Sequence, residues 1–167
     1  MHIQCTKKML DFLKPDIQTI NTDHDIYAWH MNYQTILRKK FIVLMHDLSR
    51  YCVVLYGVKK SDFKDPIDFM KKSISIAMDF DGFPKALVLE YVHGINHVTY
   101  GKTKNKTMVS QLNRAMMDAK MMAHNYLSDR LYQIDISHFL NKGPVGTNNW
   151  KEVHYPKDKM LEYMDLL

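Results

Sequence analysis

Several features that would define a class of protein are scarce in this sequence. Its 167 residues include only two cysteines, six glycines and five prolines, which excludes disulfide-rich, collagen-like and low-complexity chains. Two cysteines also cannot by themselves complete a tetrahedral zinc site. We therefore expect Cys5 and Cys52 to be buried free thiols, and we expect neither a metal ion nor a cofactor.

Long hydrophobic runs are missing as well. The longest apolar run falls far short of the roughly 18 residues that suggest a membrane span. No charged start followed by an apolar segment marks a secretory signal. We therefore expect a cytoplasmic protein with no membrane partner.

Catalytic signatures are equally scarce, since the sequence has no glycine-rich phosphate loop, no Gly-x-Ser-x-Gly turn and no Cys-x-x-Cys. The segment Asp79-Phe80-Asp81-Gly82 matches the Asp-x-Asp-Gly that follows a strand in phosphatases with an aspartate nucleophile. However, the residues before it have helical periodicity, and the chain lacks the alternating strands and helices of a doubly wound fold. We interpret Gly82 as the end of a helix.

Nine histidines leave an acid–base role open. His93 and His97 are four residues apart, but Gly94 lies between them and no glutamate follows as in a metalloprotease, so no metal site is predicted. His30 and His97, both on predicted strands, are the candidate acid–base residues. A structural role is the more common one for such histidines, so we favour a protein that is not an enzyme.

The pattern of apolar residues predicts a single α+β domain over residues 1–167, with helices packed on an antiparallel or mixed sheet. Its clearest strand signal is residues 26–36, where Trp29 and Met31 alternate with His30 and Asn32. The predicted strands are residues 1–6, 26–36, 41–45, 51–56, 97–100 and 131–136. The predicted helices are residues 7–13, 66–81, 85–92, 107–127 and 157–166. For residues 85–92 a strand is the alternative. Arg38-Lys39-Lys40 is a predicted turn, and Gly143-Pro144 opens a predicted loop with Asn148 and Asn149.

Charge is unevenly distributed along the chain. Lysine and arginine total 23 and aspartate and glutamate 18, a net charge of +5, yet residues 91–117 contain no acidic residue. Basic and amide side chains gather there before and within a predicted helix, whose free backbone N–H groups favour a phosphate or another anion. The predicted anion-binding or nucleic-acid-binding residues are Lys102, Lys104, Asn105, Lys106, Asn113 and Arg114. A solvated lysine surface with Asn105 or Thr107 as the helix cap is the simpler alternative.

Methionine is unusually common, with 13 residues. Most of those in the predicted helix 107–127 fit core packing, but Met117 and Met121 lie off its apolar stripe. Flexible apolar side chains outside the core form partner surfaces, so Met117 and Met121 are the candidate residues for a protein partner or a homodimer.

A series of short motifs resembles a known family. In chain order these are Cys5-Thr6-Lys7-Lys8-Met9-Leu10, Trp29, Arg38-Lys39-Lys40, and Lys102-Thr103-Lys104-Asn105-Lys106-Thr107 with Leu112-Asn113. They resemble a family of small bacterial proteins, often encoded on mobile elements, that is classed as a domain of unknown function. The resemblance extends from Met1 to about Pro156, and the chain departs from the family pattern at Ser110, where glycine is expected, and at Lys106, where arginine is commoner. It implies a bacterial or phage cytoplasmic α+β protein and assigns no reaction.

Three hypotheses for function follow. The first is a non-enzymatic accessory or inhibitor protein, for example an anti-defence protein, that engages nucleic acid or a nucleic-acid-handling protein through the basic helix start. The second is a small enzyme for a phosphate-bearing substrate, in which Lys102, Lys106 and Arg114 hold the phosphate and His30 or His97 moves protons. The third is a protein–protein or dimerisation module that uses the methionine-rich helix.

Overall fold

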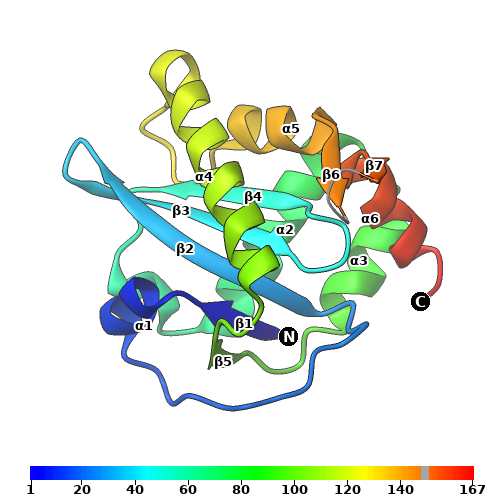
Figure 1. Ribbon diagram of the computed structural model, residues 1–167, viewed down its shortest axis with the longest axis horizontal. Coiled ribbons are helices and arrows are strands. Elements are labelled where there is room, and N and C mark those ends of the chain that lie inside the picture. The colour runs from blue at the N-terminus through cyan, green and yellow to red at the C-terminus, as the bar shows by residue number, and fades with distance from the viewer. Residues whose placement is uncertain (148–150) are drawn as a thin grey trace.

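A mixed five-stranded sheet forms the centre of the protein, and the computed structural model describes residues 1–147 and 151–167. The strands lie in the order β4-β3-β2-β1-β5 (Figure 1). Three of them pair antiparallel, namely β2 (Ala28–Ile36), β3 (Lys39–His46) and β4 (Cys52–Tyr56). The strand β1 (His2–Cys5) lies between β2 and β5 (Thr99–Lys102) and is parallel to both. The α+β fold predicted from the sequence is confirmed.

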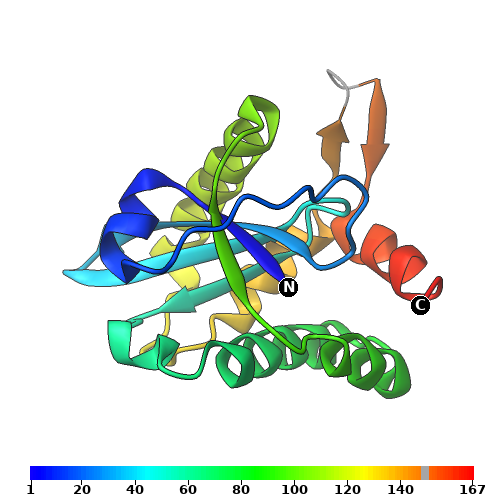
Figure 2. The same ribbon diagram turned by 90° about the horizontal axis from the view of Figure 1, so that it is seen from below.

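The sheet separates two hydrophobic clusters. Trp29 and Met31 belong to the first cluster, to which helices on one side of the sheet contribute: α1 (Lys7–Leu13), α2 (Pro66–Asp81), α3 (Lys85–His93) and α6 (Pro156–Met164). A short 3₁₀ helix, η1 (Lys60–Phe63), precedes α2. The second cluster lies on the opposite face, under α4 (Lys106–Tyr126) and α5 (Ile134–Lys142). Figure 2 shows α4 and the pair α2 and α3 on opposite sides of the sheet.

The second face is polar along β1 and β2. His30 and Asn32 alternate with the core residues Trp29 and Met31, as the period-2 pattern predicts. Gln4 pairs with His30 across the parallel ladder and points to the same face. α4 packs against β2 on this side, so the face that carries the polar side chains also carries the predicted basic helix.

The Asp-x-Asp-Gly segment is the end of a helix, as predicted. Asp65 caps α2 by accepting a hydrogen bond from the Asp68 N–H at 3.0 Å, and Pro66 occupies the first helical turn. At the other end, Gly82 adopts φ = 77°, a left-handed conformation that glycine takes at little cost. Asp79 is exposed while Asp81 is buried, so the two carboxylates are not a catalytic pair.

The predicted strand at residues 131–136 is wrong. Apart from one bridge between Tyr132 and Leu55, this segment leads directly into α5. Ser137 and Asn141 lie one helical turn apart and accept hydrogen bonds from the Val54 and Cys52 N–H groups at 2.9 and 2.7 Å. The alternation of polar and apolar residues at 133–136 thus belongs to the start of α5, and the side chains that follow it cover the edge of β4.

Smaller differences occur elsewhere. The β2–β3 turn lies at Leu37 and Arg38, which both have positive φ, so Lys39 and Lys40 belong to β3 rather than to the turn. β5 begins two residues later than predicted. The predicted loop after Gly143-Pro144 contains β6 (Val145–Thr147), which pairs with β7 (Glu152–His154). Asn148 and Asn149 of that loop lie outside the described residues.

The cysteine prediction is confirmed, because Cys5 and Cys52 are both free and buried. Burial raises the pKa of Cys52 to about 12, which disfavours the reactive thiolate. Within residues 1–147 and 151–167, no helix is long and apolar enough to cross a membrane. The same residues contain no group of three or more histidine, cysteine or acidic side chains placed to hold a metal ion.

Candidate anion-binding site

A pocket of about 520 Å³ lies beside the N-terminal half of α4. α4 forms one wall, to which Lys106, Ser110 and Arg114 contribute. The segment that leads from α5 into β6 forms another wall, and Met45 and Cys52 contribute from the sheet. In Figure 2, α4 and the β6–β7 hairpin rise from the same side of the sheet. A pocket of this volume is large enough for a small-molecule ligand.

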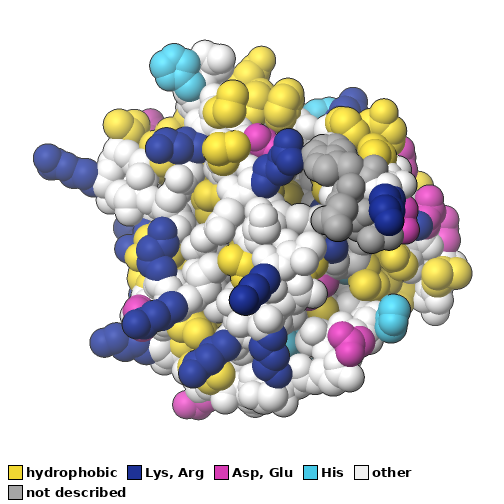
Figure 3. Space-filling model, in the orientation of Figure 1, with side chains coloured by type: hydrophobic (Ala, Val, Ile, Leu, Met, Phe, Trp, Pro, Cys, Tyr) yellow, Lys and Arg dark blue, Asp and Glu magenta, His cyan; other side chains and the backbone are white. Residues whose placement is uncertain are grey.

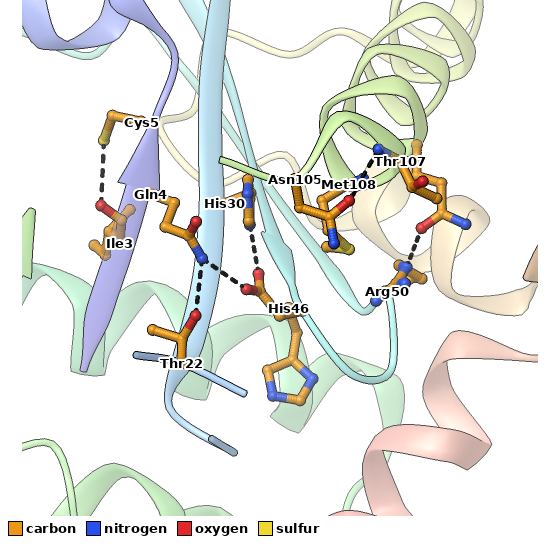
Figure 4. A network of polar contacts seen from close by, with 12 residues as sticks. Ile3, Gln4, Cys5, Thr22, His30, His46, Arg50, Asn105, Thr107 and Met108 are labelled. Atoms are coloured by element: carbon orange, nitrogen blue, oxygen red, sulfur yellow. Dashed lines mark hydrogen bonds and ion pairs between the residues drawn. The ribbon is translucent and has the colours of Figure 1, made fainter. Parts of the chain in front are cut away.

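Arg50 reaches the pocket from the β3–β4 turn. Its backbone has φ = 65°, and its N–H donates to the His46 carbonyl oxygen at 2.9 Å. The Nε of Arg50 donates to Oε1 of Gln111 on α4, and Figure 4 shows the guanidinium directed at that helix. Gln111 in turn donates through Nε2 to the Gly146 carbonyl oxygen of β6 at 3.2 Å. Hydrogen bonds therefore join three walls of the pocket.

The charge of the pocket is mainly positive. Arg50, Lys106 and Arg114 line it, against one carboxylate, Asp118. Arg50 is partly buried, and loss of solvation lowers its pKa, an effect that the charge of Asp47 opposes. Its Nη1 atom is buried without a hydrogen-bond partner among the described residues. A buried guanidinium donor without a partner costs free energy.

Asn105 has a local structural role. Its side-chain oxygen accepts hydrogen bonds from the Thr107 and Met108 N–H groups at 2.9 and 3.2 Å, which caps α4 (Figure 4). The expectation of free N–H groups at this helix start is therefore wrong for these two residues. An anion bound beside α4 would therefore be held by side chains rather than by an open helix end.

The predicted basic and amide residues do not form one cluster. Lys106 and Arg114 line the pocket, whereas Lys102 and Lys104 are exposed at and beyond the end of β5. The pKa of His2 is lowered mainly by burial and, among other charges, by Lys104. Because His2 belongs to β1, Lys104 lies toward that strand. Asn113 is also turned away from the pocket, since its Oδ1 accepts from Nδ2 of Asn32 on β2 at 3.4 Å.

The two predicted acid–base histidines lie apart, and neither lines the pocket. His30 is fully buried, and its Nδ1 lies 2.7 Å from Oδ1 of Asp47. The other Asp47 oxygen accepts from Nε2 of Gln4 at 3.1 Å, so His30 belongs to a polar network on the sheet (Figure 4). Its Nε2 has no hydrogen-bond partner in the described part of the chain. His97 is exposed in the loop before β5.

Met117 and Met121 are exposed on α4, by 58% and 68%. The buried side of the helix carries Met108, Leu112 and Met116. The prediction that Met117 and Met121 lie off the apolar stripe is confirmed. A partner that binds these two side chains stays a prediction.

Several pocket residues were not identified from the sequence, among them Arg50 and Phe139. Arg50 is an isolated basic residue in a hairpin turn, and Phe139 lies in α5, a helix that was not predicted from the sequence. For Arg50 the sequence signal is a basic residue in a tight turn between two buried strands. For Phe139 there is no such signal.

Together, the fold and the pocket define an α+β protein with an open mixed sheet and a basic pocket on one face. The family model described as Domain of unknown function (DUF6933) matches residues 2–159. The chain therefore belongs to this family, which confirms the resemblance seen in its motifs. No curated protein matches the chain.

Proposed function

We propose that the chain is a non-enzymatic protein that binds nucleic acid through its phosphate groups at the start of α4. The supporting observation is the convergence of Arg50, Lys106 and Arg114, from two segments far apart in sequence, on one pocket. Lys102 and Lys104, exposed just before α4, extend the positive charge beyond that pocket. Arginine and lysine side chains held in this way bind phosphate oxygens and fix the position of a nucleic-acid backbone.

The surface around α4 supports the proposal. Figure 3 shows lysine and arginine side chains spread over the face that α4 crosses, with few acidic side chains between them. A positive face of this kind attracts a polyanion before specific contacts form. The proposal includes the cytoplasmic location and the bacterial or mobile-element origin that the sequence and the family resemblance imply.

Charge reversal tests this function. Lys102→Glu combined with Lys106→Glu replaces two cations near the pocket by two anions, and we expect it to abolish nucleic-acid binding at low salt. For wild-type protein with about four phosphate contacts, affinity for a DNA duplex should fall roughly 100-fold between about 50 and 200 mM salt. Fluorescence anisotropy with labelled single-stranded and double-stranded DNA and RNA measures both effects.

The matched control for this experiment is Lys71→Glu combined with Lys72→Glu. It makes the same change in net charge on α2, on the opposite side of the sheet (Figure 2). Its affinity should stay within a few-fold of wild type. The proposal is wrong if wild-type protein binds neither DNA nor RNA at low salt, or if both double variants lose binding equally.

Catalysis is not part of the proposal. His30 is closed off from solvent by the surrounding chain, and His97 does not line the pocket. The geometry therefore does not place a predicted acid–base group next to a phosphate bound by Lys106 and Arg114.

A second candidate function is self-association through α4, favoured by the exposure of Met117 and Met121. Met117→Asp should weaken a dimer at least about tenfold, since a carboxylate in an apolar interface loses its solvation. Analytical ultracentrifugation over a concentration series measures this change. Leu89→Asp on α3 is the control, because Leu89 has the same exposed fraction as Met117, 58%. A wild-type chain that stays monomeric at every concentration would exclude this candidate.

A further inference from the structure

The pocket beside α4 has two chemically different sides. The cations Arg50, Lys106 and Arg114 belong to the turn and to α4, whereas the segment from α5 to β6 contributes Phe139, Leu140 and Val145. A phosphate group alone would leave the exposed side chain of Phe139 in contact with water. The ligand that satisfies both sides therefore carries an anion and a flat or apolar group in one molecule.

Phe139 indicates what the apolar group is. Its side chain is 52% exposed, although Leu140 next to it is buried. A half-exposed aromatic ring beside cations is the arrangement on which nucleic-acid-binding proteins stack bases. An aromatic base placed on Phe139 would remove this ring from water.

The polar groups of α4 make the two ends of the pocket chemically different. Thr107, Ser110, Arg114 and Asp118 all line it, and their spacing of three or four residues places them on one side of the helix. Lys106 and Asp118 are separated by about 18 Å along α4, at 1.5 Å per residue. A phosphate is attracted to the Lys106 end and repelled from the Asp118 end, where a carboxylate accepts hydrogen bonds from an amino or hydroxyl group.

We infer that this pocket binds a single nucleotide unit, with the base stacked on Phe139 and the phosphate held by Lys106 and Arg114. The inference rests on the proposed function, because it uses the same cations. It adds that the bound nucleotide is unpaired, since a base inside a duplex cannot reach an aromatic side chain in a pocket. The protein therefore prefers single strands to duplexes.

Calorimetric titration with the four ribonucleoside monophosphates tests the pocket directly, with adenosine and inorganic phosphate as partial ligands. At least one monophosphate should bind about tenfold or more tightly than either partial ligand. Phe139→Ala should weaken that nucleotide about 5- to 100-fold, the range for loss of one stacking platform. Phe139→Trp should retain the affinity, and Phe80→Ala, which removes an exposed phenylalanine from α2, should not change it.

Oligonucleotide binding separates this inference from the proposed function. Phe139→Ala should reduce affinity for a single strand but leave the weaker, salt-dependent binding of a duplex unchanged. If no monophosphate binds more tightly than inorganic phosphate, while oligonucleotides still bind in a salt-dependent way, the nucleotide pocket is refuted and the proposed function stands. If monophosphates bind as expected but oligonucleotides do not, the pocket is supported and the nucleic-acid function is refuted.

Discussion

Asp81→Ala is expected to lower the free energy of unfolding by about 3–5 kcal/mol, because two buried polar groups lose their acceptor at a cost of about 1–3 kcal/mol each. Asp79→Ala, two residues earlier on the same helix, should change it by less than about 0.5 kcal/mol because that side chain is exposed. The two carboxylates that resemble a catalytic motif should thus differ strongly in their effect on stability.

The expected loss follows from what Asp81 holds together. Its Oδ2 accepts from the Tyr51 hydroxyl at 2.6 Å and from Nδ2 of Asn141 at 3.0 Å. Its Oδ1 contacts Nδ1 of His138 on α5. These bonds connect the end of α2 to the start of β4 and to α5. Alanine would leave the buried Tyr51 hydroxyl and Asn141 amide without this acceptor, and each such group costs about 1–3 kcal/mol.

Urea denaturation followed by the fluorescence of the buried Trp29 measures the loss. Asp81→Asn keeps an oxygen acceptor for Tyr51 and should lose less stability than the alanine variant. Equal stability of the Asp79 and Asp81 alanine variants would show that the buried network contributes little.

Local patterns predicted the parts of the fold that depend on neighbouring residues. The alternation around Trp29 gave β2 with its two faces, and Asp65-Pro66 with Gly82 gave both ends of α2. α5 could not be found in this way, because Ser137 and Asn141 face β4 for a reason that involves another strand. Their polar side chains take the place of strand partners for Cys52 and Val54, and no local rule contains that information.

The same distinction applies to the candidate site. Lys106 and Arg114 were predicted because they lie close together in an acid-free stretch. Arg50 and Phe139 were not, because only the packing of the β3–β4 turn and of α5 against α4 brings them to the same pocket. Contiguous charge is visible in a sequence, whereas a pocket built from separate segments depends on the tertiary structure.

Stability should also fall steeply in acid because of His46. This side chain is fully buried beside Trp29, and burial, only partly offset by a hydrogen bond to the Ile26 carbonyl oxygen, lowers its pKa to about 4. Its Nε2 lies 2.9 Å from that oxygen, and its Nδ1 accepts from the Ser49 N–H at 3.1 Å. Nε2 thus acts as a donor and Nδ1 as an acceptor, as in the neutral imidazole, and a second proton on Nδ1 would break the bond from Ser49.

The sign of the effect follows from the two pKa values. The unfolded chain takes up a proton on His46 near its ordinary pKa of 6.5, whereas the folded chain does so only near 4. Between these values the unfolded state binds more protons, so stability is retained above pH 6.5 and lost as the pH falls toward 4. The loss from this group is about 3 kcal/mol. His2 and His154, whose pKa values burial also lowers, add to it in the same direction.

His46→Gln isolates the contribution of this residue. Glutamine keeps an amide donor for the Ile26 carbonyl oxygen but does not titrate, so the variant should be less stable than wild type at pH 7 and have a flatter pH profile. The difference in unfolding free energy between the two proteins should shrink by about 3 kcal/mol from pH 7 to pH 4. His97→Gln, at an exposed position, is the control for the effect of a histidine-to-glutamine change itself. A difference between His46→Gln and wild type that stays constant with pH would mean that His46 is protonated equally in the folded and unfolded chains, and burial would then not control its charge.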